Sequence, residues 1–406
     1  MTPEAVVLGE AEALLFAGRV ADAEALCTTA FGAGAAPYIA RLRFLLARAQ
    51  DPATGAECIA LDAAITQMNA ELARNPLYSA SEYWVDHGGR HRALLLNYGM
   101  ANFKRTVSHN YQNWLIVTQS DPQLQAMLAQ WPRYGSAEPW SNEIETPSHV
   151  GYHYGDSEYP LVDPARREIY KLAIGLIWEY VLVNDKSGLL QGLEESEIGN
   201  PIRITRQGRL ISSDLAHSLR ERNLLLDTCG LRGDEGLTIG ELGAGHGRLA
   251  EIFGRTTNYR YVIFDIAPAL YVAQWYTQRL FPNERIFTFR PFASFAEIAE
   301  ELAGCRFAFF TANQIEAFPD EAFDFFINMN SLMEMRREQI INFIRHIDRL
   351  TRRAFLSRQW LKWYNDTDKI TVGAGDFELG AAWTKTLDAI DEIHPQMFNH
   401  IWQRRS

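Results

Sequence analysis

Residues 237–253 read Leu-Thr-Ile-Gly-Glu-Leu-Gly-Ala-Gly-His-Gly-Arg-Leu-Ala-Glu-Ile-Phe, and this stretch decides the fold class. The apolar run at 237–242 predicts a short strand, and the pattern from 248 to 253 predicts the start of a helix. Gly243, Gly245 and Gly247 fill the turn between them. Because glycine adopts the backbone angles of such a turn without steric cost, the stretch predicts a strand–turn–helix unit whose backbone approaches a ligand closely.

Strand and helix patterns alternate from this turn to the C-terminus. The apolar runs predict strands at 261–264, 285–289, 306–310, 323–328 and 354–357. Helical patterns separate them at 268–280, 295–302 and 336–350, and the segments 388–393 and 398–402 are typical of a closing hairpin. Such alternation predicts an α/β fold, a Rossmann-like sheet with crossover helices at the C-terminus.

The chain before the turn differs in composition. Residues 1–75 are rich in Ala, Leu and Glu with helical spacing, and the segments starting at Gly18 and Gly55 are similar at an offset close to the ~34-residue period of tetratricopeptide helix pairs. An Ala-rich helical hairpin of no particular family fits equally well. We expect these helices to serve packing, homodimer formation or a protein partner. Residues 76–220 are dense in aromatic and polar side chains and predict a second, mostly helical region, followed by the α/β domain at 221–406.

Charge, hydropathy and cysteine usage exclude several classes. The 406 residues carry a net charge of −11, which argues against nucleic acid as a partner. The longest apolar stretch, 172–183, is interrupted by Glu179 and is shorter than the ~20 residues that span a bilayer, so it predicts a buried helix and no membrane contact. The four cysteines are far apart and form no CxxC pair, which favours reduced thiols in the cytoplasm.

The glycine spacing separates two kinds of ligand. A dinucleotide site has the pattern GxGxxG, with the pyrophosphate at a helix N-terminus. Here the pattern is ExGxGxG. S-adenosylmethionine has no phosphate, and the tighter turn suits its methionine tail, while Glu241 adds a carboxylate near the cationic ammonium and sulfonium groups. Asp265 ends the next strand, where its carboxylate can accept hydrogen bonds from both ribose hydroxyls of any nucleoside ligand. The expected cofactor contacts are Glu241, Gly243, Ala244, Gly245, Gly247, Asp265, Ile266, Asn313, Gln314 and Asn330.

Several stretches between Tyr98 and the C-terminus resemble one family. They are Asn102-Phe-Lys104 with Asn110-Tyr111, Gly199-Asn-Pro201, Ile211-Ser-Ser-Asp214, and the longer blocks 241–248, 261–270 and 327–335. Together they are similar to the sugar O-methyltransferases of antibiotic deoxysugar and surface-polysaccharide gene clusters. The family often has Tyr where this chain has His246, and two prolines where this chain has Ala267-Pro268. The resemblance implies methyl transfer from S-adenosylmethionine to a sugar hydroxyl in a biosynthetic pathway.

A sugar hydroxyl has a high pKa, so a general base should assist its attack. Glu334, after the strand at 323–328, is the first choice, with the alternative that it braces the helix beginning at Arg336. His246 in the glycine turn is the second choice, with the alternative that it covers the methionine tail. His153 belongs to an aromatic loop that could close over the site.

Three further alternatives remain open on the sequence. Asp366 and Asp368 are the nearest approach to a metal cluster, but a turn explains them equally, and we expect no metal. The same fold could methylate nitrogen, carbon or a carboxylate of another small molecule. A non-catalytic scaffold that senses the cofactor and binds a partner through its N-terminal helices is the alternative outside enzymes, although the intact glycine turn and Asp265 argue against it.

Overall fold

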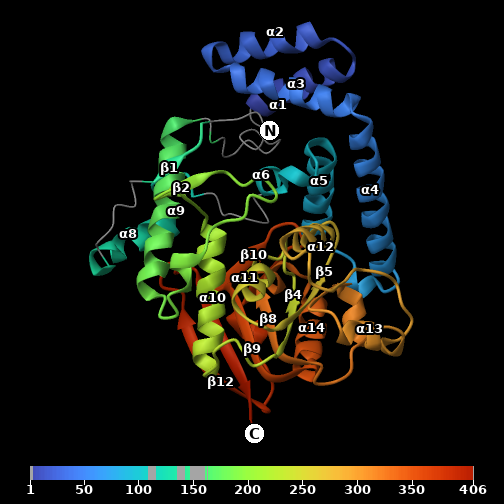
Figure 1. Cartoon of the computed structure of the whole chain (residues 1–406), viewed down its shortest axis with the longest axis vertical. Coiled ribbons are helices and arrows are strands. Elements are labelled where there is room, and N and C mark those ends of the chain that lie inside the picture. Colours follow the sequence, from blue (N-terminus) through green and yellow to red (C-terminus); the bar gives the residue numbers. More distant parts are fainter. Residues whose placement is uncertain (1–2, 108–115, 135–141, 147–160, 162, 406) are drawn as a thin grey trace. The chain divides into compact units, whose positions relative to one another are not determined.

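The computed structural model describes residues 3–107, 116–134, 142–146, 161 and 163–405 (Figure 1). The chain forms two compact units. The first combines residues 1–62, 91–180 and 194–213, and the second combines 63–90, 181–193 and 214–406. Both units join segments that are distant in the sequence. The division into regions 1–75, 76–220 and 221–406 stays a prediction.

An eight-stranded sheet forms the centre of the second unit, with strand order β12-β13-β9-β8-β4-β5-β7-β6. The six strands from β9 to β6 are parallel to one another, whereas β13 pairs antiparallel with both β9 and β12, and β12 and β13 form the expected closing hairpin. The open α/β sheet is thereby confirmed. Its strands are β4 (Thr238–Leu242), β5 (Arg260–Asp265), β6 (Ile286–Phe287), β7 (Phe307–Thr311), β8 (Phe323–Met329), β9 (Thr351–Trp360), β12 (Trp383–Ile390) and β13 (Met397–Arg404).

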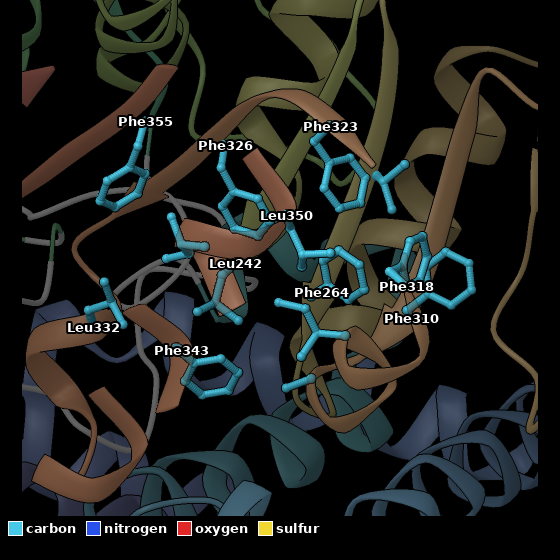
Figure 2. Packing of buried hydrophobic residues seen from close by; sticks show 14 of the residues in the cluster. Leu242, Phe264, Phe310, Phe318, Phe323, Phe326, Leu332, Phe343, Leu350 and Phe355 are labelled. Carbon is cyan, nitrogen blue, oxygen red and sulfur yellow. The ribbon is translucent and has the colours of Figure 1, made fainter. Parts of the chain in front are cut away.

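Successive strand residues point to opposite sides of the sheet. Because apolar side chains lie on both sides, helices cover both faces. Leu242 and Phe264 pack with residues of α13 (Ala299–Ala303) and α14 (Arg337–Leu350) in the cluster that Figure 2 shows. Ile239 and Tyr261 belong to the cluster on the other face, which includes residues of α10 (Ser213–Cys229), α11 (Arg248–Thr256) and α12 (Ala269–Leu280). The result is a three-layer α/β/α arrangement.

The strand order reverses direction at β4. The chain continues from β4 to β5 on one side and later returns to β8 on the other. In open α/β sheets, ligands bind outside the carboxyl ends of the strands at such a switch point. The glycine turn, Asp265 and residues 330–334 all follow strands that end at this edge.

In the first unit, α1 (Pro3–Phe16), α2 (Val20–Phe31) and α3 (Ala36–Gln50) pack around a small apolar core that includes Ala11, Ala23 and Leu42. The two similar segments have different structures here. Gly18 lies in the turn before α2, whereas Gly55 lies within the continuous helix α4 (Pro52–Leu72). The described part of residues 1–75 is mostly helical, and a repeated helix pair stays a prediction.

The rest of the first unit contains a small antiparallel sheet of β1 (Glu143–Ile144), β2 (Ile204–Arg206) and β3 (Arg209–Ile211). Helices α6 (Phe103–Thr106) and α8 (Pro122–Tyr134) belong to it, as do most of α9 (Pro164–Asn184) and the second part of α5 (Glu82–Tyr98). The apolar stretch 172–183 lies in α9 and is mostly buried, as expected. Among the described helices, none is long and apolar enough to cross a membrane.

Three of the blocks that resemble the family meet inside this first unit. Lys104 and Glu195 form a fully buried ion pair, and Ser212 donates its hydroxyl to the same Glu195 carboxylate. The backbone N–H of Lys104 donates to the carbonyl of Gly199 at 2.9 Å. The Asn200 side-chain amide donates to Asn102 Oδ1 at 2.8 Å. These contacts give the blocks at 102–104, 199–201 and 211–212 a structural explanation.

Candidate functional site

The glycine turn has the predicted geometry. Gly243, Gly245 and Gly247 have φ values of 71°, 60° and 86°, in the left-handed region that side chains disfavour. The N–H of Gly243 donates to the carbonyl of Phe264 at 2.8 Å, which ties the turn to the end of β5. α11 begins directly after Gly247. The backbone of this turn is thus fixed at the switch point of the sheet.

Gly243→Ala should damage this turn. A Cβ at this position would lie 2.2 Å from Oγ of Ser331, in addition to the strain of its positive φ. We expect a loss of about 2–4 kcal/mol in the free energy of unfolding. Chemical denaturation measures it, and Gly375→Ala is the matched control because its site is open and its φ is not positive. Equal stability of the two variants would contradict the turn geometry.

Asp265 is buried beside the turn, with an exposed fraction of 7%. Its Oδ2 accepts from the N–H of Gly245 at 2.9 Å and its Oδ1 from the N–H of Ile266 at 2.7 Å. Burial raises the pKa of Asp265 to about 7, although these backbone hydrogen bonds lower it. A carboxylate has about four acceptor positions, and the backbone N–H groups of Ile266, Gly245 and Ala244 do not use all of them. The arrangement fits the predicted ribose contact.

Glu241 is also buried, at 2% exposed. Its carboxylate accepts a hydrogen bond from the hydroxyl of Tyr261 at 2.8 Å, and burial raises the pKa of Glu241 to about 8. No sequence motif points to this tyrosine partner, because it lies on the neighbouring strand. The role of Glu241 beside the ammonium group stays a prediction.

Two other expected cofactor residues, Asn313 and Gln314, have protein partners. Asn313 donates to the backbone and side-chain oxygens of Glu71 at 3.2 and 3.1 Å. Gln314 accepts from the N–H of Thr311 at 3.0 Å and donates to the carbonyl of Arg290 at 2.9 Å. These bonds give both amides structural roles in the turn after β7, and their contact with the cofactor stays a prediction.

Asn330 has a left-handed backbone with φ of 59°, which asparagine tolerates better than most residues. Its N–H donates to the carbonyl of Arg358 at 2.8 Å. In the amide orientation that satisfies both atoms, its side chain also pairs with Arg358, at 3.1 and 3.3 Å. Asn330 therefore shapes the turn after β8, and its contact with the cofactor stays a prediction.

Glu334 lies in the short helix η8 (Leu332–Glu334) after β8. Its Oε2 accepts from the indole N–H of Trp84 at 2.9 Å, and its backbone carbonyl accepts from Oγ of Ser81 at 3.0 Å. The residue as a whole is half-buried. Burial is nevertheless the main cause that raises its pKa, to about 8, and the nearby charge of Asp265 adds to the effect. The two carboxyl groups therefore act on each other across the same edge of the sheet.

The alternative role proposed for Glu334, bracing the helix that follows it, is performed by another residue. The N-terminus of α14 is capped by Gln339, whose Oε1 accepts from the N–H of Arg336 at 3.0 Å. Trp84 and Ser81 were missed in the sequence, because they lie some 250 residues before Glu334 and belong to no motif.

A buried network fixes the turn that carries Glu334. Nδ2 of Asn328 donates to the carbonyl of Leu242 at 2.8 Å and to Oγ of Ser331 at 2.6 Å. Oδ1 of Asn328 accepts from the N–H of Leu332 at 3.2 Å and from the amide of Gln359 at 2.5 Å. The ends of β4, β8 and β9 are thereby joined directly beneath η8.

His246 lies in the turn, and the residue is almost fully buried, with an exposed fraction of 1%. Its Nε2 is 4.0 Å from Oδ2 of Asp214, and its ring meets that of Tyr276 edge-on at 5.7 Å. These partners come from α10 and α12, so the ring packs on the helical side of the turn. A catalytic role for His246 stays a prediction. His153 lies outside the described residues.

Other side chains considered in the sequence have structural partners. Asp368 accepts from the N–H groups of Glu82 and Tyr83, and Asp366 pairs with Lys369. Among the described residues, no group of three His, Cys, Asp or Glu side chains is placed to hold a metal ion. The four cysteines are free thiols.

No family model and none of the curated proteins matches the chain. Solved structures similar to part of it include magnesium protoporphyrin IX methyltransferase of Synechocystis PCC 6803 with bound SAH (14% identity, 47% of this chain, 86% of that chain, TM-score 0.35). Another is 1,6-didemethyltoxoflavin-N1-methyltransferase of Burkholderia thailandensis with bound S-adenosylhomocysteine (14% identity, 48% of this chain, 80% of that chain, TM-score 0.33). A third is a SAM-dependent methyltransferase of Aquifex aeolicus (12% identity, 46% of this chain, 89% of that chain, TM-score 0.31). Each likeness is confined to about half of this chain, and the proposal below rests on the site residues.

Proposed function

We propose that this protein is a methyltransferase of the class I Rossmann-like type that uses S-adenosylmethionine and methylates a hydroxyl group, with Glu334 as the general base. The observation that carries the proposal is the meeting of three groups at one edge of the sheet. They are the positive-φ glycine turn, the buried Asp265, and the half-buried Glu334 with the Trp84 indole on its carboxyl group.

The residues present fit this cofactor. The backbone at 243–247 would hold the methionine tail, and the carboxylate of Asp265 would receive the ribose hydroxyls. The nearby carboxyl groups of Asp265 and Glu334 suit a ligand with a net positive charge. When bound, S-adenosylmethionine supplies an electrophilic methyl group on its sulfonium.

Glu334 is suited to the proton transfer. The Trp84 indole occupies Oε2, while no group in the described part of the chain donates to Oε1. A carboxyl group with a pKa of about 8 is partly ionised near neutral pH and is a stronger base than an ordinary glutamate. During methyl transfer, Oε1 would accept the proton that the acceptor hydroxyl releases. Methyl transfer depends strongly on how the reacting groups are aligned. The hydrogen bonds of the turn beneath η8 would therefore also contribute, because they fix the position of Glu334.

A sugar is the acceptor class that we propose, because the block at 327–335, which carries Glu334, resembles sugar O-methyltransferases. The test is incubation with S-adenosylmethionine carrying a labelled methyl group and a panel of nucleotide sugars, deoxysugars and glycosides, with amines and carboxylates of similar size as controls. Label in a sugar hydroxyl is the expected result. Label only in an amine or a carboxylate would refute the acceptor class. No binding of S-adenosylmethionine at millimolar concentration would refute the enzyme.

Cofactor affinity should rise with pH. Free Asp265 has a pKa raised to about 7, and only its ionised form can accept both ribose hydroxyls. Below this pKa, each unit of pH should strengthen binding about tenfold, and above it the affinity should level off. Calorimetry in two buffers of different ionisation enthalpy should show proton release below about pH 7. A constant affinity between about pH 5.5 and 8 would contradict the assignment.

A further inference from the structure

The N-terminal turn of α5, which belongs to the second unit, carries a group of three rings. Tyr83 and His87 stack with their centroids 4.1 Å apart, and Trp84 meets these two rings at steep angles, at 5.8 and 6.0 Å. Burial, and then the charge of Glu334, raises the pKa of Tyr83. The ring group therefore lies within electrostatic reach of the proposed base.

Two hydrogen bonds join this turn to the segment of the base. The Trp84 indole N–H donates to Oε2 of Glu334 at 2.9 Å, and the Ser81 hydroxyl donates to the carbonyl of the same residue at 3.0 Å. One bond holds the carboxyl group and the other holds its backbone. Rotation of the Glu334 side chain about its last bonds would break the first of them.

Asp368 fixes the start of α5. Its Oδ1 and Oδ2 accept from the N–H groups of Glu82 and Tyr83, at 3.1 and 3.3 Å, which satisfies two backbone groups that have no partner within the helix. Nδ2 of Asn365 donates to Oδ2 of Asp368 at 2.8 Å. The aspartate lies in the turn between β10 (Lys362–Asn365) and β11 (Ile370–Gly373), so this hairpin is attached directly to the helix that carries Trp84.

We propose that Trp84 is a positioning residue of the methyl-transfer reaction, which holds Oε2 of Glu334 so that Oε1 faces the acceptor, and that Asp368 keeps Trp84 in place. This inference rests on the proposed function of Glu334. A charge-assisted hydrogen bond from the indole favours the ionised carboxyl group. Trp84 therefore sets both the direction of the base and the pH at which it becomes active.

Trp84→Phe removes the N–H and keeps an aromatic ring. We expect the midpoint of the kcat–pH profile to rise by about one unit, because a hydrogen bond to a charged group is lost. At pH 7, kcat should fall about tenfold, and it should recover at pH values above the new midpoint. KM for the cofactor should stay the same. Asp368→Ala should shift the midpoint in the same direction.

Val85→Ala is the matched control, since Val85 lies on the same turn and is 58% exposed. Its profile should equal that of the parent. If Trp84→Phe loses activity equally at every pH, the residue is merely structural and the proposal is wrong. The proposal is also wrong if this variant keeps the parent profile.

A second measurement does not depend on activity. The chain has 10 tryptophans, so its indole N–H resonances can be resolved by ¹⁵N NMR and Trp84 assigned from Trp84→Phe. We expect this one resonance to titrate with a midpoint of about 8 in the parent and to stay unchanged with pH in Glu334→Gln. No titration in the parent would overturn the proposal. If the resonance titrates but the protein transfers no methyl group, the contact between Trp84 and Glu334 is real and the proposed function is refuted instead.

Discussion

Glu334→Gln should lower kcat by about 10²–10⁴, the usual contribution of a general base. Glutamine has the shape of the original side chain and keeps an oxygen for the Trp84 indole, but it cannot accept the proton. The kcat–pH profile, which should rise through the raised pKa of about 8 in the parent, should become flat in the variant. Steady-state kinetics across this pH range measure both effects. Affinity for S-adenosylmethionine should change much less than kcat.

Loss of folding would not explain this result. The folded-state pKa of Glu334 lies above its value of 4.5 in the absence of perturbation, so the folded chain retains a proton that the unfolded chain has lost. Stability therefore falls as pH rises between these two values, and the uncharged glutamine removes that penalty. We expect the variant to be at least as stable as the parent near neutral pH. Glu338→Gln, on the exposed surface of α14, is the control. Unchanged kcat in Glu334→Gln would exclude this residue as the base.

Asp265→Asn should weaken the binding of S-adenosylmethionine by at least about 100-fold. The variant loses the charge that strengthens two ribose hydrogen bonds, each worth about 1.5–3 kcal/mol when one partner is charged. Its amide N–H also faces a backbone N–H, either of Gly245 or of Ile266, which disturbs the turn itself. Isothermal titration calorimetry with the cofactor and with S-adenosylhomocysteine should show the same loss, because both ligands carry the ribose.

Asp366→Asn is the matched control, because the Asp366 side chain is 84% exposed and pairs only with Lys369 among the ion pairs of the described chain. Its affinity for the cofactor should equal that of the parent. The pH dependence of binding should also disappear in Asp265→Asn and persist in the control. Affinity within about threefold of the parent would show that Asp265 does not hold the ribose.

The central sheet could be predicted because its signals are local. Apolar runs, glycines and helical spacing placed the strands at 261–264, 306–310 and 323–328 close to the observed β5, β7 and β8. The glycine turn and Asp265 were also accessible, since backbone strain and strand ends depend on neighbouring residues. By contrast, the β10–β11 hairpin was not predicted, and its role depends on its contact with α5.

The hydrogen-bond partners of the candidate site residues could not be predicted, because they depend on contacts between distant parts of the chain. Glu334 could be singled out from its position after β8, but only packing shows that Trp84 holds its carboxyl group and that Gln339 caps α14 in its place. Asn313 and Gln314 could be placed after β7, whereas their hydrogen bonds to Glu71, Thr311 and Arg290 required the folded chain.

The sequence by itself determined the strand–turn–helix unit at 237–253, the parallel sheet and the position of Asp265 at a strand end. Strand periodicity and glycine geometry act over a few residues, so one segment contains all that they require. Only the tertiary structure decided which groups raise or lower the pKa of Glu334 and of Glu241. Burial and hydrogen bonding depend on groups that only folding brings to these carboxyl groups, Trp84 to Glu334 and Tyr261 to Glu241.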